Sequence, residues 1–271
     1  MNYNLSGVVV SSDVTAEVQL ELFKNNVPVI SGGWQCSIHY NGQKLRKISD
    51  WKERNSQTEN DCELLEIESE LDGGFRLRRF CLLDVANRIF VACDSILGDL
   101  SLEKDRGKRL RYESTFICSD NLKSSKSGKN VKSDIIFKPS PKVSNLNKPA
   151  SFRVIPLASS VVEFLRASGG KIYLSQNCES SSMFVPIFFD FKLSRIDKKT
   201  IWRELTVGEN LEQVPPDKAT AYRIQTGKDQ FLLYCSLIPS ASRTFLGHNL
   251  IDEICYAKFD PKLGVTPLLT K

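Results

Sequence analysis

Alternation of apolar and polar residues is the dominant pattern along this 271-residue chain. In residues 16–22 apolar side chains recur every second residue, with Glu or Gln between them, and Trp34, Cys36, Ile38 and Tyr40 repeat the pattern. A period of two is typical of a β-strand with one face on a core and the other in water. The pair Asn41-Gly42 is typical of a two-residue hairpin turn, so a hairpin is predicted there.

A second hairpin is predicted between residues 63 and 83. The alternating segments LLEIESEL and FRLRRFCLL are joined by Asp72-Gly73-Gly74, whose glycines can adopt positive φ. Residues 88–97 (RIFVACDSIL) are more continuously apolar, which predicts a strand in a sheet that is packed on both faces.

Strand patterns continue to the end of the chain. They cover residues 111–118, 152–157, 171–176, 184–191, 201–207, 221–225, 230–237, 253–259 and 265–269. Helical spacing occurs only in residues 161–167. We therefore predict an all-β fold with very little helix, either an antiparallel β-sandwich or stacked extended sheets in the manner of a supersandwich.

The composition changes between residues 120 and 149, where Ser, Lys, Asn and Pro predominate. This segment is predicted to be a polar, basic linker or a long loop. It separates an N-terminal β-sheet portion, residues 1–119, from a C-terminal portion, residues 150–271. We expect the two portions to pack together as one continuous domain.

The cysteines and the N-terminus bear on the compartment. The N-terminal residues lack a basic region followed by an apolar one, and no uncharged stretch approaches the roughly 20 residues that span a bilayer. The eight cysteines are scattered without a CxxC pair, and the two histidines, His39 and His248, complete no zinc-binding pattern. We therefore expect a cytoplasmic protein with free thiols, no membrane contact, no metal and no cofactor.

Positive charge is concentrated in one tract. Residues 104–132 hold nine Lys or Arg against three acidic residues, a local charge of +6 in a chain of net charge +5. Arg106, Lys108, Arg109 and Arg111 are the candidate polyanion-binding residues of this tract. The segment LKSSKSGKNVKS has no aromatic residue on which a base could stack, so a solvated loop is favoured over a nucleic-acid contact.

The sequence carries no self-sufficient catalytic motif. It has no GxSxG, HExxH, P-loop or Rossmann-type glycine turn. Glu66, Glu68 and Glu70 share one strand face, which is predicted to be exposed to solvent and not to be a pair of catalytic carboxylates.

The tryptophans are the side chains best suited to stack on a sugar ring. Trp51 and Trp202 have charged neighbours, which suits exposed platforms with Arg203 available for sugar hydroxyls, but packing of all three tryptophans in the core is the favoured alternative. Trp34 alternates with core positions and is predicted to be buried.

Several segments resemble the C-terminal β-sandwich region of heparinase II/III-like polysaccharide lyase proteins. These are GWQCSIHYNGQKL, ISDW, DCELLEIESEL and GGFRLRRFCLLDVANRIFVACDSI, in which the matching positions are Arg78, Arg79, Asp84, Arg88 and Asp94. The later segments MFVPIFFDF, WRELTVGEN, AYRIQTGKDQFLLYCSL and RTFLGHNL are similar to the end of uncharacterised heparinase-like proteins of planctomycete-type bacteria. The resemblance implies a β-sandwich and a polysaccharide context.

Three functional hypotheses follow from the resemblance and the residues. The resemblance implies a non-catalytic, carbohydrate-associated or accessory module, because the family's helical toroid, which supplies much of the catalytic apparatus, has no counterpart in the strand pattern. The alternatives are a degenerate or partner-dependent polysaccharide lyase using His39, Tyr40 or Tyr222 for proton abstraction, and polyanion binding through residues 104–132. A polysaccharide is the expected partner, and self-association through edge strands stays open.

Overall fold

The computed structural model describes residues 2–5, 8–12, 18–24, 27–98, 109–120, 122–126, 134–140, 151–158, 161–239 and 242–271. These residues are almost all in β-strands, with two single-turn 3-10 segments at Asp72–Gly74 and Leu193–Arg195 and no α-helix among them. The prediction of an all-β fold with very little helix is confirmed. The described part of the chain has no helix long and apolar enough to cross a bilayer.

The strands form four antiparallel sheets, and the strands of each sheet are named in their spatial order. The first sheet is β1 (Asn2–Leu5), β2 (Val8–Ser12), β3 (Val18–Lys24), β4 (Val27–Tyr40), β10 (Leu110–Ile117), β15 (Lys171–Cys178) and β14 (Val161–Ser168), with β5 (Gln43–Lys44) paired to β4. The central sheet is β11 (Leu122–Lys126), β12 (Ile135–Pro139), β13 (Phe152–Pro156), β16 (Met183–Asp190), β9 (Ile89–Leu97), β8 (Arg76–Asp84), β7 (Cys62–Glu70) and β6 (Lys52–Glu59). The third sheet is β17 (Thr200–Leu205), β20 (Ala219–Thr226), β21 (Asp229–Ser236), β24 (Ile254–Asp260) and β25 (Gly264–Thr270). The small sheet is β19 (Glu212–Gln213), β18 (Gly208–Glu209), β22 (Arg243–Phe245) and β23 (His248–Leu250).

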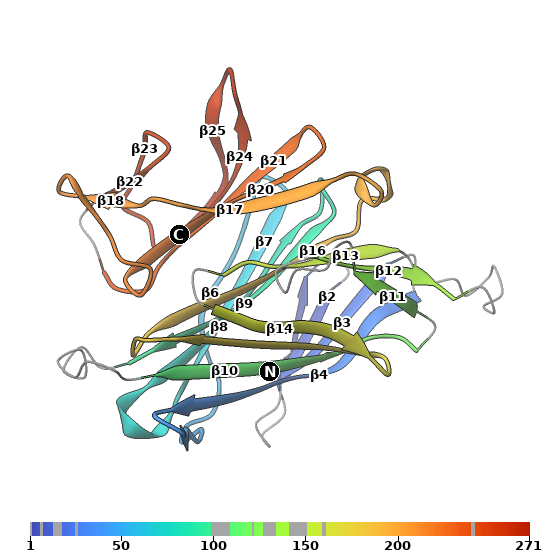
Figure 1. Ribbon diagram of the computed structural model, residues 1–271, viewed down its shortest axis with the longest axis horizontal. Helices are drawn as coiled ribbons and strands as arrows, with labels where there is room; N and C mark the ends of the chain where they lie inside the picture. Colours follow the sequence, from blue (N-terminus) through green and yellow to red (C-terminus); the bar gives the residue numbers. More distant parts are fainter. Residues whose placement is uncertain are drawn as a thin grey trace.

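The sheets stack in layers with a hydrophobic core between each pair (Figure 1). Strand β9 shows why the central sheet is buried on both faces. Its residues Phe90 and Ala92 belong to the first core, between the first and central sheets, whereas Val91 and Cys93 belong to the second core, between the central and third sheets. The prediction of a doubly packed strand at residues 88–97 is therefore confirmed.

Two local predictions differ from the structure. Part of the segment predicted as a linker or loop, residues 120–149, is sheet, because β11 and β12 pair and extend the central sheet beyond β13. The Phe137 ring stacks on Phe152 with centroids 4.7 Å apart, which anchors β12 to the core. Residues 121, 127–133 and 141–149 of that segment lie outside the described residues.

Residues 161–167, whose apolar spacing is helical in the sequence, lie in strand β14. A register shift between Val162 and Phe164 in the β14–β15 pair interrupts the period of two. A bulge places two residues opposite one, so the apolar positions fall at intervals that resemble a helix.

Both predicted hairpins are confirmed. Asn41 and Gly42 join β4 to β5 with φ values of 50° and 81°, as a turn of the mirror-image type requires. Strands β7 and β8 pair in continuous register across Asp72–Gly74.

Candidate functional site

A short connection after the β4–β5 hairpin crosses from the first sheet to the central sheet. Residues 44–48, which we call the strap, begin at the first sheet, where the Leu45 amide donates a hydrogen bond to the Ile38 carbonyl (2.9 Å). They end at the central sheet, where the Ile48 amide donates to the Glu70 carbonyl (2.9 Å). The strap therefore closes one end of the first core.

A cavity of ≈ 320 Å³ lies under the strap. Ligand pockets in proteins start at about 300 Å³, so this cavity has the size of a small ligand site. Its apolar wall includes Trp34, Trp51 and Leu77, and its rim carries the strap side chains Lys44, Arg46 and Lys47. We call this cavity the strap pocket.

The inner wall of the strap pocket contains a buried guanidinium. The Arg79 side chain is 2% exposed and donates two hydrogen bonds of 2.8 Å to the Asp94 carboxylate and one of 2.8 Å to the Trp34 carbonyl. Its central carbon lies 3.8 Å from the centroid of the Trp34 ring and 5.3 Å from that of Trp51. The Tyr112 hydroxyl donates to the second oxygen of Asp94 (2.6 Å).

Burial and neighbouring charges shift the pKa values of Arg79, Tyr112 and Cys36. Burial lowers the pKa of Arg79, but the Asp94 carboxylate outweighs it and raises the pKa above its ordinary value. Burial raises the pKa of Tyr112 well above its usual range, so that hydroxyl keeps its proton. Burial also raises the pKa of Cys36, in the pocket wall, to about 12, which makes it a poor nucleophile.

The uncompensated charge of the strap pocket therefore comes from the strap. Arg46 is paired with Asp72 at 3.3 Å and is 83% exposed. Lys44 and Lys47 have no carboxylate within ion-pair distance among the described residues, and the Lys47 ammonium lies 5.7 Å from the centroid of the Trp51 ring. Two free ammonium groups over an apolar wall suit an anionic ligand with an apolar face.

The structure separates the predicted sugar-stacking residues. Trp51 is 5% exposed, so it is not an exposed platform and follows the packing alternative: its ring is covered by Arg79 and Lys47. Trp34 is buried, as predicted. The half-buried Trp202 ring makes an edge contact with Tyr222 (centroids 6.1 Å apart), facing the core.

Arg203 follows Trp202 on β17 and so points to the opposite face of the third sheet. The structure therefore does not bring Trp202, Arg203 and Trp51 into one carbohydrate platform.

The three candidate proton-abstracting residues do not converge either. His39 lies directly opposite Arg111 in the β4–β10 pair, on the outer face of the first sheet. Tyr40 points to the other face, with its ring 4.7 Å from Phe75, and Tyr222 is fully buried in the second core.

The basic tract is only partly described. Arg111 is close to two carboxylates, those of Glu113 (2.9 Å) and Glu163 (3.3 Å), and the exposed Arg109 lies 3.5 Å from Glu179. Arg106 and Lys108 lie outside the described residues. The two described arginines are thus already paired with acidic groups.

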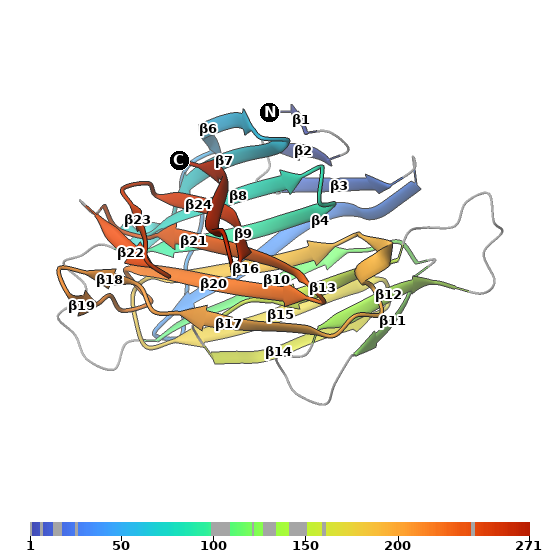
Figure 2. The ribbon, with the colours of Figure 1, turned by 90° about the horizontal axis from the view of Figure 1, so that it is seen from above.

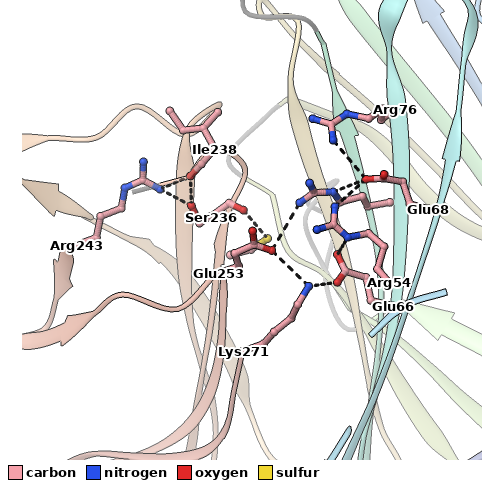
Figure 3. Close-up of polar contacts among 11 residues, drawn as sticks. Arg54, Glu66, Glu68, Arg76, Ser236, Ile238, Arg243, Glu253 and Lys271 are labelled. Atoms are coloured by element: carbon pink, nitrogen blue, oxygen red, sulfur yellow. Dashed lines mark hydrogen bonds and ion pairs between the residues drawn. The ribbon is translucent and has the colours of Figure 1, made fainter. Parts of the chain in front are cut away.

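A cluster of charges that the sequence patterns did not indicate lies at the edge of the second core (Figure 3). Glu66 of β7 is 2% exposed, which overturns the prediction of a solvent-facing acidic strand. Its carboxylate contacts the Lys271 ammonium, which also lies 3.4 Å from the Glu253 carboxylate. These contacts join the central sheet to the third sheet.

The same cluster gathers three arginines around Glu68. Arg54 and Arg78 donate hydrogen bonds of 3.0 Å and 2.7 Å to one Glu68 oxygen, and Arg76 lies 3.8 Å from it. Arg54 is the extra residue where the β6–β7 register shifts between Glu53 and Asn55. We call the whole cluster the seam; it comprises Arg54, Glu66, Glu68, Arg76, Arg78, Glu253 and Lys271.

A further arginine joins the outer layers. The buried Arg243 of the small sheet donates a hydrogen bond of 2.6 Å to the Ser236 hydroxyl, at the end of β21 (Figure 3). It donates another hydrogen bond of 2.9 Å to the Glu209 carboxylate. The described residues contain no group of three His, Cys, Asp or Glu side chains placed to hold a metal ion.

Comparison with known proteins places the fold. No family model and no curated protein matches the chain. A solved heparinase III gene product matches with a TM-score of 0.53 at 10% identity, over 87% of this chain and 42% of its own. Heparan sulfate lyase HepC from Pedobacter heparinus matches with a TM-score of 0.52 at 12% identity, over 88% of this chain and 42% of its own.

At such low identity these matches establish a shared fold. The chain is a stacked β-sheet protein that shares the fold of part of this heparinase III chain and of HepC. It spans about two fifths of the length of those proteins. The resemblance predicted from the sequence is confirmed at this structural level, and the planctomycete type stays a prediction.

Proposed function

We propose that this chain is a non-catalytic module that binds an acidic carbohydrate in the strap pocket. The observation that carries the proposal is the pair of uncompensated ammonium groups, Lys44 and Lys47, at the rim of a ≈ 320 Å³ cavity lined by Trp34 and Trp51. An acidic sugar offers a carboxylate or sulfate for the ammonium groups and C–H groups for the apolar wall.

The buried network supports this role by holding the wall in place. The Asp94 carboxylate pairs with the Arg79 guanidinium, so that guanidinium packs between the Trp34 and Trp51 rings without a net charge to offer a ligand. The charge that binds the ligand therefore comes from the strap. The relation to a heparan sulfate lyase supports the choice of an anionic polysaccharide as ligand.

The non-catalytic part of the proposal is supported by the placement of the candidate proton-abstracting residues. His39 and Tyr40 point to opposite faces of β4, and Tyr222 is enclosed in the second core. A partner-dependent lyase is the second candidate, because His39 has a buried Nδ1 without a hydrogen-bond partner among the described residues and lies opposite Arg111. A rise in ultraviolet absorbance from an unsaturated uronic product, lost on His39→Ala, would favour that candidate.

The binding proposal is tested by calorimetric titration of heparan sulfate oligosaccharides and of neutral oligosaccharides at two salt concentrations. We expect the double variant Lys44→Gln, Lys47→Gln to bind the acidic oligosaccharides about tenfold more weakly than wild type. The matched control is Lys123→Gln, Lys126→Gln, which removes the same charge from exposed positions on β11. Equal weakening by both double variants, or no binding by wild type, would overturn the proposal.

A further inference from the structure

The third sheet is covered unevenly on its outer face. The small sheet packs over one end, where Ala221 and Tyr234 contribute to the third core with Phe245 and Leu250. The other end of β17 and β20 extends beyond the small sheet (Figure 2). Within the described part of the chain, no further sheet covers the outer face at that end (Figure 2).

Two arginines face each other on this uncovered end. Arg203 of β17 is directly opposite Arg223 of β20 in the antiparallel register. Directly opposed residues have Cβ atoms about 5 Å apart, and like charges in that position destabilise a sheet. The arrangement therefore calls for a group that compensates the charge.

The protein itself supplies no carboxylate for this pair within the described residues. Arg223 donates two hydrogen bonds to Gln230 Oε1 and lies 4.6 Å from the centroid of the Phe259 ring, and both partners are uncharged. Arg203 forms no hydrogen bond or ion pair with a described residue. The buried Arg79, Arg195 and Arg243, in contrast, each contact an Asp or Glu carboxylate.

A cavity of ≈ 240 Å³ lies at the two guanidinium groups. Ile201 and Gln225 are opposite each other and form the next pair along the same face; together with Trp202 they complete the lining of the cavity. Ile201 is an exposed apolar residue beside the charges, so the cavity offers both an anion-binding end and an apolar edge.

We propose that the groove formed by Ile201, Arg203, Arg223 and Gln225 binds an oxyanion group, a sulfate, phosphate or carboxylate. Two guanidinium groups present several N–H donors in planar arrays that match the oxygens of such groups. The anion removes the repulsion between Arg203 and Arg223, so binding and stability of the third sheet are coupled. The groove lies on the outer face of the third sheet and does not depend on the strap pocket.

The experiment is titration calorimetry of wild-type protein with inorganic sulfate, inorganic phosphate and glucuronate at constant ionic strength, followed by glucose 6-sulfate. We expect saturable binding of at least one of these anions and about tenfold weaker binding in Arg203→Gln, which loses one guanidinium. Tighter binding of glucose 6-sulfate than of inorganic sulfate would assign the site to a sulfated sugar, and the reverse to a free anion.

Two controls make the result decisive. Lys228→Gln removes one positive charge from the nearby β20–β21 turn without touching the groove, and it is expected to bind as wild type does. The strap variant Lys44→Gln, Lys47→Gln is also expected to bind anions at the Arg203–Arg223 groove as wild type does. A failure of the groove proposal is therefore distinguishable from a failure of the strap-pocket proposal.

Since Arg203→Gln removes a repulsion, its thermal unfolding midpoint without anion should be no lower than that of wild type. Indistinguishable titrations of wild type and Arg203→Gln with all the anions would overturn the proposal.

Discussion

The two faces of the central sheet hold charge in different ways. Toward the first sheet, Arg79 and Asp94 form one fully buried pair with parallel hydrogen bonds of 2.8 Å, closed by the Tyr112 hydroxyl. Toward the third sheet, the seam places its charges at the edge of the core, where several of them reach solvent.

The difference lies in how many partners each charge has. Each member of the buried pair depends on the other, whereas the seam shares four cations among three carboxylates. A buried charge that loses its partner lowers the stability of the fold strongly, because nothing replaces its lost solvation. A half-exposed charge that loses its partner is solvated by water, so the loss of stability is smaller. We therefore expect the first region to be sensitive to single substitutions and the second to be tolerant of them.

The largest effect is expected from Asp94→Ala. This change leaves the Arg79 guanidinium buried and unpaired, so we expect the free energy of unfolding to fall by about 3–5 kcal/mol. Urea unfolding followed by circular dichroism measures it. The control is the triple variant Arg79→Met, Asp94→Leu, Tyr112→Phe, which removes every polar side chain of the network and leaves only the Trp34 carbonyl without its Arg79 donor, so it should cost clearly less. A loss under about 1 kcal/mol for Asp94→Ala would contradict the description of a dry pair.

A smaller effect is expected from Glu66→Ala in the seam. Lys271 then keeps Glu253, and Arg54 keeps Glu68, so we expect a loss of about 1–3 kcal/mol in the same urea experiment. If Glu66→Ala destabilised the protein as strongly as Asp94→Ala, the seam would have to be regarded as a second buried network.

The smallest effect is expected in how the free energy of unfolding depends on pH in the acidic range. Burial raises the pKa of Glu68, but hydrogen bonds from Arg78 and Arg54 outweigh it and hold that pKa below its ordinary value. A lowered pKa contributes stability that is present above the unfolded pKa, about 4.3, and is lost as the pH falls through the folded pKa. We therefore expect Glu68→Gln to lose less stability than wild type between about pH 5 and pH 3, measured by urea midpoints. Parallel curves for the two proteins would contradict this assignment.

Much of the fold could be predicted because its strands follow local patterns. The period of two around Trp34, the Asn41-Gly42 turn and the apolar run from Ile89 to Leu97 depend only on neighbouring residues. The prediction that Glu66 faces solvent was wrong because it considered the β7 sequence alone. The apolar run of β9 predicts a sheet buried on both faces, and β7 belongs to the same sheet, so both of its faces are covered and Glu66 is buried.

The candidate site was less accessible from the sequence. The charged neighbours of Trp51 suit an exposed ring, yet those neighbours face solvent while the ring forms a pocket wall. Lys44 and Lys47 become rim residues only because the strap bridges two sheets, and Arg203 meets Arg223 only through the β17–β20 register. Such pairings are long-range and leave no mark on local periodicity.

The double burial of the central sheet has a consequence for how its strands are aligned. In a sheet with one wet face, a slip of one residue exposes the apolar set and is rejected. In β8 and β9 both faces are apolar, so a slipped strand would merely exchange the contents of two cores. Arg79 and Asp94 are directly opposite each other in the β8–β9 ladder, and a slip would break their pairing inside an apolar layer. The buried charge pair thus tells the two faces apart where hydrophobicity alone does not.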